Sequence, residues 1–163
     1  MEKTDNNLLH IVLVEPEIPQ NTGNIGRTCV GLGATLHLVG ELGFSLEAKD
    51  VKRAGLDYWA HLKLMRHLTW DAFEAALPAE ASLFFFSTKG SSSLWDMRFR
   101  APVYFVFGSE SRGLPPSFYK RFRESLVRIP IEKEIRSLNL ATAVGIAAYD
   151  AARQLWHTLN SKF

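Results

Sequence analysis

The sequence has a single cysteine, little net charge and no long apolar run, and each absence excludes a class of protein. With Cys29 as its only cysteine, the chain can form neither an internal disulfide nor a cysteine-rich zinc site, and the apolar stretch around it predicts a buried thiol. The formal net charge is +2, so a polyanionic partner would have to meet a local basic patch. No apolar run approaches the ~18 residues of a membrane span, which together with the polar N-terminal segment predicts a soluble, cytoplasmic protein.

The chain length indicates the number of domains, and the absence of two kinds of motif excludes further protein classes. A chain of 163 residues with 47% hydrophobic content is long enough for one well-filled core and too short for two ordinary domains, so we expect a single domain over residues 1–163. Gly108 and Gly113 have the spacing of a phosphate-binding loop, but Leu114 and Pro115 stand where the lysine and hydroxyl residues of that loop must follow. The five histidines have no metal-ligand spacing, so no metal site is expected.

Short apolar runs alternate with stretches that favour helices. The expected strands are 8–14, 35–39, 61–64, 83–86, 103–107 and 126–131. The expected helices are one over about 21–32, short ones over 47–54 and 70–77, and a long alanine-rich one that begins near Ser137. Asn21 or Thr22 is expected to cap the first helix, and Thr69 or Asp71 the third. The alternation, with strands that are apolar on both faces, predicts an α/β fold with a mainly parallel sheet flanked by helices.

Polar residues gather directly after several of the expected strands. The sets are Asn21, Asn24 and Arg27; Ser87 and Thr88; Gly108, Glu110 and Arg112; and Ser137 and Asn139. Because the carboxyl ends of parallel strands share one edge of a sheet, we expect these four loops to converge on a single crevice. The crevice is rich in hydrogen-bonding groups and poor in groups that titrate near neutral pH. It would therefore act by positioning and electrostatics rather than through a histidine base.

Three segments around these loops resemble known sequence motifs. Residues 15–27, 107–115 and 128–140 resemble the three motifs of the SPOUT RNA 2'-O-ribose methyltransferases, and the similarity extends over nearly the whole chain. Within that superfamily the chain is similar to the compact enzymes that methylate the wobble nucleotide of tRNA. The resemblance implies a SPOUT fold with a C-terminal trefoil knot, S-adenosylmethionine bound in the knotted loops, and a homodimer. Without it we would expect no knot, because knots are very rare.

The same resemblance implies roles for individual residues. The cofactor-binding residues would be Phe86, Ser87, Thr88, Gly108, Ile129 and Ser137. The catalytic residues would be Arg27, Asn21, Glu110, Ser137 and Asn139. Since an arginine is normally protonated, we expect Arg27 to stabilise the oxyanion that develops on the ribose, with Ser137 or a water relaying its proton. The two asparagines would brace Arg27.

Each of these residues also has a purely structural interpretation. Asn21 could cap a helix, and Asn139 could serve the first turn of the next one. Arg27 could pair with a glutamate of the preceding loop, at position 15 or 17. Glu110 could hold the motif loop by accepting hydrogen bonds from backbone amides. The alanine-rich last helix could pack against its own sheet as well as against a second subunit.

Two segments, 98–100 and 120–123, interleave cations with aromatic residues, a pattern suited to phosphate pairing and base stacking. The basic residues that could extend this patch are Lys49, Lys52, Arg53 and Arg128. The expected RNA-binding residues are Arg27, Arg112, Arg121 and Arg123. The alternative is that both segments are ordinary solvated faces, with Phe99 and Phe122 turned into the core.

The sequence therefore predicts transfer of a methyl group from S-adenosylmethionine to the ribose 2'-hydroxyl of nucleotide 34 in a tRNA anticodon, with leucine isoacceptors as the implied substrates. One alternative keeps this chemistry and changes the target to another tRNA position or to ribosomal RNA. A second alternative is a non-catalytic knotted module that binds RNA or a metabolite. The joint presence of Arg27, Glu110, Ser137 and Asn139 disfavours it, because a binding module does not need all of them.

Overall fold

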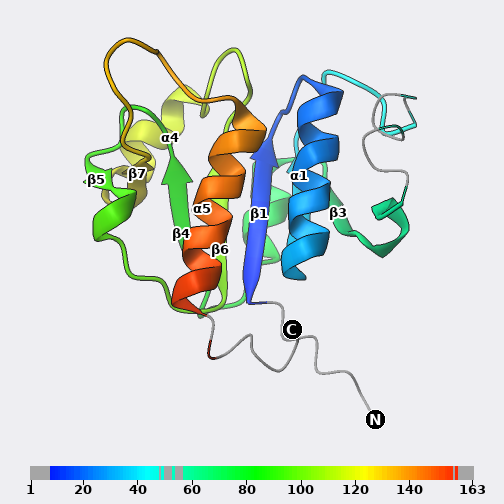
Figure 1. The fold of residues 1–163 in the computed structure, drawn as a ribbon, viewed down its shortest axis with the longest axis horizontal. Coiled ribbons are helices and arrows are strands. Elements are labelled where there is room, and N and C mark those ends of the chain that lie inside the picture. The colour runs from blue at the N-terminus through cyan, green and yellow to red at the C-terminus, as the bar shows by residue number, and fades with distance from the viewer. Residues whose placement is uncertain (1–7, 48, 50–52, 54–56, 156, 158–163) are drawn as a thin grey trace.

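The computed structural model describes residues 8–47, 49, 53, 57–155 and 157 (Figure 1). Within them seven parallel strands form one sheet in the order β3-β2-β1-β6-β4-β7-β5. The strands are β1 (Leu9–Val14), β2 (Thr35–Val39), β3 (Lys63–His67), β4 (Ser82–Phe86), β5 (Ser92–Ser93), β6 (Val103–Phe107) and β7 (Leu126–Arg128). The predicted α/β fold with a mainly parallel sheet is confirmed. The short helix predicted over 47–54 falls largely outside the described residues.

Most strands lie where the apolar runs predicted them, and two differ. The strand expected at 61–64 starts later, because Trp59–His61 form a 3-10 turn and β3 begins at Lys63. The strand expected to reach residue 131 ends at Arg128. Pro130 has no N–H and cannot continue the ladder of hydrogen bonds. Residues 129–139 therefore form an irregular loop that leads to the last helix.

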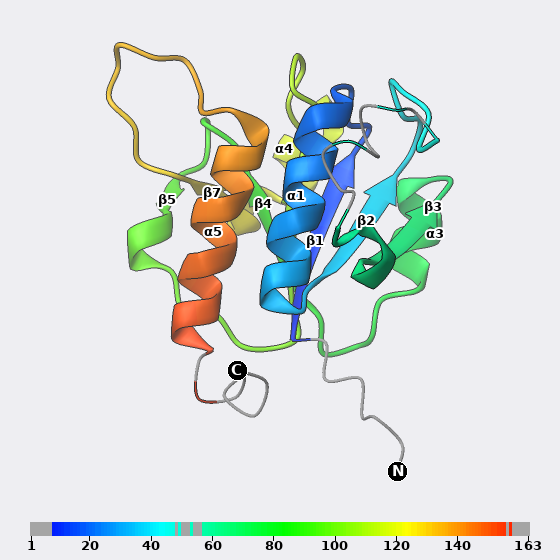
Figure 2. The same ribbon diagram turned by 45° about the vertical axis from the view of Figure 1, so that its right-hand side comes forward.

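Helices cover both faces of the sheet. Those with defined bounds are α1 (Pro19–Leu32), α3 (Trp70–Ala75), α4 (Pro116–Arg121) and α5 (Leu140–Gln154). α1 and α5 lie side by side over one face, and α3 and α4 cover the other (Figure 2). The predicted burial of Cys29, on the inner face of α1, is confirmed, and removal from water raises the pKa of its thiol to about 12. In the part of the chain that the structure describes, no helix is long and apolar enough to span a membrane.

α1 starts earlier than predicted. Its first residue is Pro19, whose fixed φ and missing N–H suit the first turn of a helix. Ile18 holds the N-cap position and supplies no side-chain hydrogen bond, so the prediction that Asn21 or Thr22 caps this helix is wrong. α1 ends at Leu32 as predicted, and Gly33 caps it with a left-handed φ of 67°.

α5 starts later than predicted. Its N-cap is Asn139, whose side-chain oxygen accepts a hydrogen bond from the N–H of Thr142 at 3.2 Å. The prediction that the helix starts at Ser137 is therefore wrong by about two residues, and Ser137 lies in the loop before the helix. The predicted cap of α3, Thr69, is confirmed.

The connection between β4 and β5 passes over another strand. β7 pairs with β4 on one side and with β5 on the other, so residues 87–91 have to cross β7. The crossing is close, because a methyl group at Gly90 would overlap the backbone of Val127. Arg128, which the sequence grouped with the basic patch, fastens the crossing by donating to the carbonyls of Gly90 and Ser91. The Arg128 guanidinium thus stabilises the loop that crosses β7.

A row of three histidines crosses the face of the sheet covered by α3. His10 of β1, His37 of β2 and His67 of β3 lie on neighbouring strands. The nitrogen–nitrogen distances are 2.9 Å between His10 and His37 and 3.0 Å between His37 and His67. Burial, followed by the neighbouring imidazoles, lowers the pKa of His37 to about 3. The row, called the histidine row below, is a hydrogen-bonded part of the core, and no group of described residues has the arrangement of a metal site.

Candidate active site

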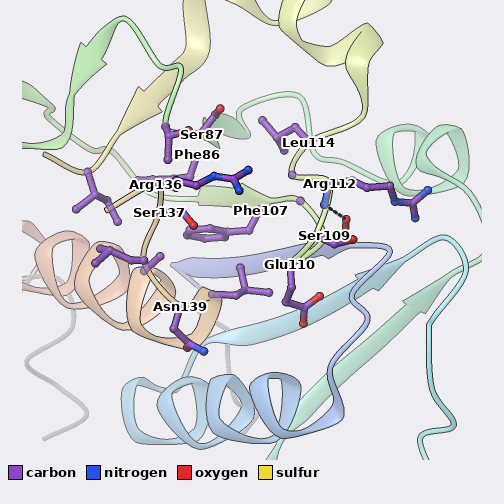
Figure 3. Close-up of a pocket in the computed structure, with 18 of the residues that line it drawn as sticks. Phe86, Ser87, Phe107, Ser109, Glu110, Arg112, Leu114, Arg136, Ser137 and Asn139 are labelled. Carbon is purple, nitrogen blue, oxygen red and sulfur yellow. Dashed lines mark hydrogen bonds between the residues drawn. The ribbon is translucent and has the colours of Figure 1, made fainter. Parts of the chain in front are cut away.

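A cavity of about 720 Å³ opens at the carboxyl edge of the sheet (Figure 3). This volume lies in the range of small-molecule sites. The loops after β4, β6 and β7 line it together with the first turns of α1 and α5. Of the residues predicted for the site, the lining includes Asn21, Phe86, Ser87, Thr88, Gly108, Glu110, Arg112, Ile129, Ser137 and Asn139. Four loops that are distant in sequence thus meet at one crevice.

Glu110, in the loop after β6, holds the start of α1. Its carboxylate accepts hydrogen bonds from the backbone N–H groups of Glu17 at 2.7 Å and Ile18 at 3.0 Å. The N-cap residue of α1 supplies no side-chain acceptor of its own, and the carboxylate from this distant loop holds the backbone immediately before the helix, near the positive end of its dipole. The structural interpretation of Glu110 as an acceptor for backbone amides is confirmed, and the residue also borders the cavity.

Two asparagines connect Glu110 to the start of α5. Asn21 donates from Nδ2 to Glu110 Oε1 at 3.3 Å. Its Oδ1 accepts from Asn139 Nδ2 at 3.0 Å, and Asn139 in turn caps α5. Asn21 is only 5% exposed, so pairing both ends of its amide avoids the cost of burying unsatisfied polar atoms. This amide network, Glu110–Asn21–Asn139, joins the three motif segments and fixes the starts of two long helices.

The loop after β6 is closed by short backbone contacts. Ser109 and Gly113 exchange two hydrogen bonds, with N–O distances of 3.1 and 2.9 Å. A methyl group at Gly108 would overlap the backbone of Gly113, so only glycine permits this approach. At Gly108 the loop therefore lines the cavity with backbone atoms alone.

Arg112, and not Arg27, pairs with the glutamates after β1. Its guanidinium lies 3.7 Å from the carboxylate of Glu15 and 4.0 Å from that of Glu17. The Ser111 hydroxyl donates to both carboxylate oxygens of Glu17, at 2.7 and 2.9 Å. These hydrogen bonds, foremost that from Ser111, hold the pKa of Glu17 below its usual range. Ion pairs and hydrogen bonds therefore connect the loop after β6 to the loop after β1 at this side of the cavity.

The wall next to β4 combines aromatic rings with hydroxyl groups. Phe86 stacks on Phe107 with ring centroids 4.8 Å apart. The Ser87 hydroxyl lies 3.0 Å from that of Tyr119 and accepts the N–H of Lys89 at 3.1 Å. The Lys89 ammonium lies over the Tyr119 ring, 5.3 Å from its centroid. Apolar faces with a few placed hydroxyls suit a flat aromatic ligand that needs orientation.

Arg27 does not line the cavity. It follows Asn21 by six residues, a rotation of roughly 240° on a helix, so the two side chains leave α1 in different directions. The guanidinium lies over the Tyr58 ring, 5.6 Å from its centroid, and Tyr58 donates to the Gly23 carbonyl of α1 at 3.2 Å. A single chain therefore does not bring Arg27 to the other predicted catalytic residues.

The basic segments also lie apart from the cavity. Arg121 pairs with Glu74, with N–O distances of 2.6 and 2.7 Å, and Arg123 is exposed in the turn after α4. Phe99 is 6% exposed and belongs to the core under α1 and α5. Phe122 packs on the opposite core, stacked on an aromatic ring of β4 at 4.1 Å. The alternative in which both aromatics face the core is confirmed, so neither ring is presented for base stacking.

Several lining residues were not among the predictions. They include Lys89, Leu114, Tyr119, Ile131 and Arg136. Arg136 directly precedes Ser137 in the third motif, and that adjacency was a usable signal. Tyr119 carried no such signal, because it comes from α4, a helix that was not predicted.

The model of the SpoU rRNA methylase family matches residues 8–149. The chain belongs to this family. The match includes every loop that lines the cavity. The chain is 46% identical over 149 residues to the tRNA (cytidine(34)-2'-O)-methyltransferase of Burkholderia cenocepacia, covering 90% of this chain and 96% of that protein. It is 47% identical over 148 residues to the protein of the same name from Methylovorus glucosotrophus, again covering 90% and 96%.

Solved structures of SpoU relatives share the arrangement of the sheet. One, which concerns the 2-OH methylation of C/U34 on tRNA, is 51% identical with a TM-score of 0.89 and covers 93% of this chain and 99% of that one. Another, an AdoMet-bound rRNA methyltransferase from Sinorhizobium meliloti, is 29% identical with a TM-score of 0.80 and covers 92% of this chain and 57% of that one. The similarity to the SpoU family thus extends to the three-dimensional fold.

Proposed function

We propose that this protein transfers the methyl group of S-adenosylmethionine to the ribose 2'-hydroxyl of nucleotide 34 in a tRNA anticodon, with leucine isoacceptors as substrates. The observation that carries the proposal is the amide network, which joins the three motif segments around one cavity. The names of relatives that are 46% and 47% identical support the same chemistry.

The lining residues suit S-adenosylmethionine. Phe86 and Ile129 offer apolar surface for the two faces of an adenine, and Ser87 and Thr88 offer hydroxyls. The bare backbone at Gly108 adds hydrogen-bonding groups that no side chain blocks. When bound, this cofactor supplies an electrophilic methyl group on a sulfonium.

The second requirement of the reaction is removal of a proton from the ribose hydroxyl, which is a poor nucleophile. A ribose hydroxyl has to lose its proton as it attacks the methyl group. We assign stabilisation of the ribose oxyanion to Arg27, because a guanidinium stays protonated and can stabilise negative charge. We assign the proton relay to Ser137 or a water. Asn21 hydrogen-bonds to both Glu110 and Asn139, so the contribution of these three residues is to hold α1 and α5 in place.

The position of Arg27 favours a homodimer. Because Arg27 leaves the cavity of its own chain, it could serve the cavity of a partner if α1 and α5 form the interface. Tyr149 on α5 is 57% exposed, and Ile18 before α1 is 42% exposed. A partner that covers this surface would remove apolar groups from water.

A trefoil knot is the second structural part of the proposal. The passage of residues 87–91 over β7 supports a chain whose C-terminal segment has been threaded through a loop. We propose one SPOUT domain over residues 1–163 that acts on tRNA in the cytoplasm.

A methylation assay tests the function. Purified protein is mixed with labelled S-adenosylmethionine and a tRNA-Leu transcript, and the product is located by nuclease digestion and mass spectrometry. We expect one methyl group on the ribose of nucleotide 34, and none on a control transcript that carries a deoxyribose there. Methylation at another position or of ribosomal RNA would support the first alternative. Cofactor binding with no methyl transfer to any RNA would support the non-catalytic one.

Mixed dimers test the role of Arg27. We expect Arg27→Ala to abolish methyl transfer and to bind the cofactor almost normally. Co-expression of Arg27→Ala with Ser137→Ala should restore up to half of the activity per dimer, because one composite site keeps both residues. If no activity returns in verified mixed dimers, Arg27 does not act across the interface.

Salt-dependent binding tests the RNA contacts. Arg112, Arg121 and Arg123 are proposed to meet phosphates, although Arg121 would first have to leave Glu74. Arg123→Glu should lower the slope of log affinity against log salt by about one. An equal loss for Arg121→Glu would support both contacts, and an unchanged slope for either variant would remove that residue from the interface.

A further inference from the structure

Arg136 is a lining cation that the mechanism above does not use. It lies in the loop before α5, next to Ser137, and Figure 3 shows its guanidinium directed over the middle of the lining residues. No hydrogen bond or ion pair joins it to another residue that the structure describes. A guanidinium carries five N–H donors. Its position therefore marks where an anionic part of a ligand can be held.

The other cations of the lining already have partners. Arg112 lies within 4.0 Å of two carboxylates, and Figure 3 shows its side chain directed away from the cavity. Lys89 lies over the Tyr119 ring. Among the described cations that line the cavity, Arg136 is the one left for a ligand.

We propose that Arg136 binds the carboxylate of the methyl donor's amino-acid tail and thereby selects S-adenosyl amino acids over adenosine thioethers that lack the tail. The inference rests on the proposed function. A guanidinium and a carboxylate fit together through two parallel hydrogen bonds. Ile129 and Ser137 flank the same loop, so a nucleoside held against this wall brings its tail within reach of Arg136. An RNA phosphate would approach from outside, the direction in which Arg112 points.

Calorimetry with two ligands tests the assignment. The probes are S-adenosylhomocysteine, which has the carboxylate, and 5'-methylthioadenosine, which lacks the amino-acid tail. Arg136→Gln should weaken S-adenosylhomocysteine about tenfold, or about 1.4 kcal/mol, and 5'-methylthioadenosine less than about twofold. Arg136→Lys keeps the charge and should recover part of the loss. Arg112→Gln, the matched arginine of the same lining, should leave both affinities unchanged.

The outcomes separate this inference from the function on which it rests. Equal weakening of both ligands would show a structural role for Arg136 and overturn the inference, with thermal melting of each variant as the folding control. Unchanged affinity for S-adenosylhomocysteine together with weaker tRNA binding would assign Arg136 to an RNA phosphate and also overturn it. If the unaltered protein bound neither probe, the proposed function would fail and the inference with it.

Discussion

Two polar clusters in this molecule have similar hydrogen-bond lengths and different places in the fold. The amide network lies at the carboxyl edge of the sheet, beside the cavity, and joins loops that are far apart in sequence. The histidine row lies inside three neighbouring strands and packs against Phe73 of α3. The amide network lines a cavity, whereas the histidine row is buried at positions where apolar side chains would otherwise pack.

The difference shows how the position of a polar residue along a parallel strand decides its task. A polar residue just after a strand faces the edge that all strands share, where ligands bind. A polar residue within a buried strand faces the core and has to find its partner on the next strand. Four predictions test this contrast, from the largest expected effect to the smallest.

Breaking the amide network at its charged end should have the largest combined effect on stability and turnover. Glu110→Ala leaves two backbone N–H groups and the Asn21 amide without their acceptor. We expect the free energy of unfolding to fall by about 2–3 kcal/mol and turnover to fall by about 100-fold, since small misplacements of a site cost that much. Urea unfolding and initial rates measure both. Glu110→Gln keeps one acceptor oxygen and should lose less, whereas unchanged stability of Glu110→Ala would contradict the prediction.

Acid should break the histidine row. The pKa of His37 is about 3 in the folded protein against an ordinary 6.5, so the unfolded chain binds more protons between these values. His37 therefore makes its whole contribution to the free energy of unfolding above about pH 6.5. This contribution declines as the pH falls toward 3, and the free energy of unfolding should be lower by roughly 3 kcal/mol at pH 4. Unfolding measured across this range should show a shallower slope for His37→Gln than for the exposed control His61→Gln. Equal slopes would mean that the row is not the acid-sensitive element.

Changing one end of Asn139 at a time should separate its two bonds. Asn139→Ala removes the cap of α5 and the link to Asn21, and we expect a loss of about 1–2 kcal/mol in unfolding free energy. Asn139→Asp keeps the acceptor for Thr142 and loses only the donor to Asn21. It should be the more stable variant, and its turnover should still fall. If both variants lost equal stability, the cap would not matter.

A buried hydroxyl next to the network provides the smallest effect. Thr22 is fully buried, and its hydroxyl has no hydrogen-bond partner among the described residues. Thr22→Val has nearly the same shape and should raise the unfolding free energy by about 0.5–1 kcal/mol, because an unsatisfied polar group leaves the core. Thermal melting measures the gain. A clear loss of stability would reveal a partner for this hydroxyl.

Much of the sheet and many of the polar residues that line the cavity followed from local patterns. Apolar runs such as Thr35–Val39 and Val103–Phe107 marked strands to the residue, because a parallel strand is buried on both faces. The polar loops after them were assigned to one crevice for the same reason. The helix starts were less accurate, since the carboxylate that holds the backbone just before α1 comes from Glu110, far along the chain.

Side-chain direction escaped the local patterns altogether. Tyr119 reaches the cavity from a helix that was not predicted, while Arg27 turns away from it although its motif contributes Asn21. The histidine row depends on the register of three strands, which pairs residues that no spacing in the sequence brings together. Direction and register are set when the elements pack.

The sequence by itself determined most of the alternating strands and helices, the polar loops at the strand ends and the three motif segments, because these depend on residue type and short-range periodicity. Only the tertiary structure decided that Glu110 supports α1, that Arg112 rather than Arg27 meets the glutamates after β1, and that Arg136 lies at the cavity with no ion pair to another described residue. The physical reason is that a hydrogen bond or ion pair needs two groups within a few ångströms of each other. For residues some ninety positions apart, that distance exists only once the sheet has assembled.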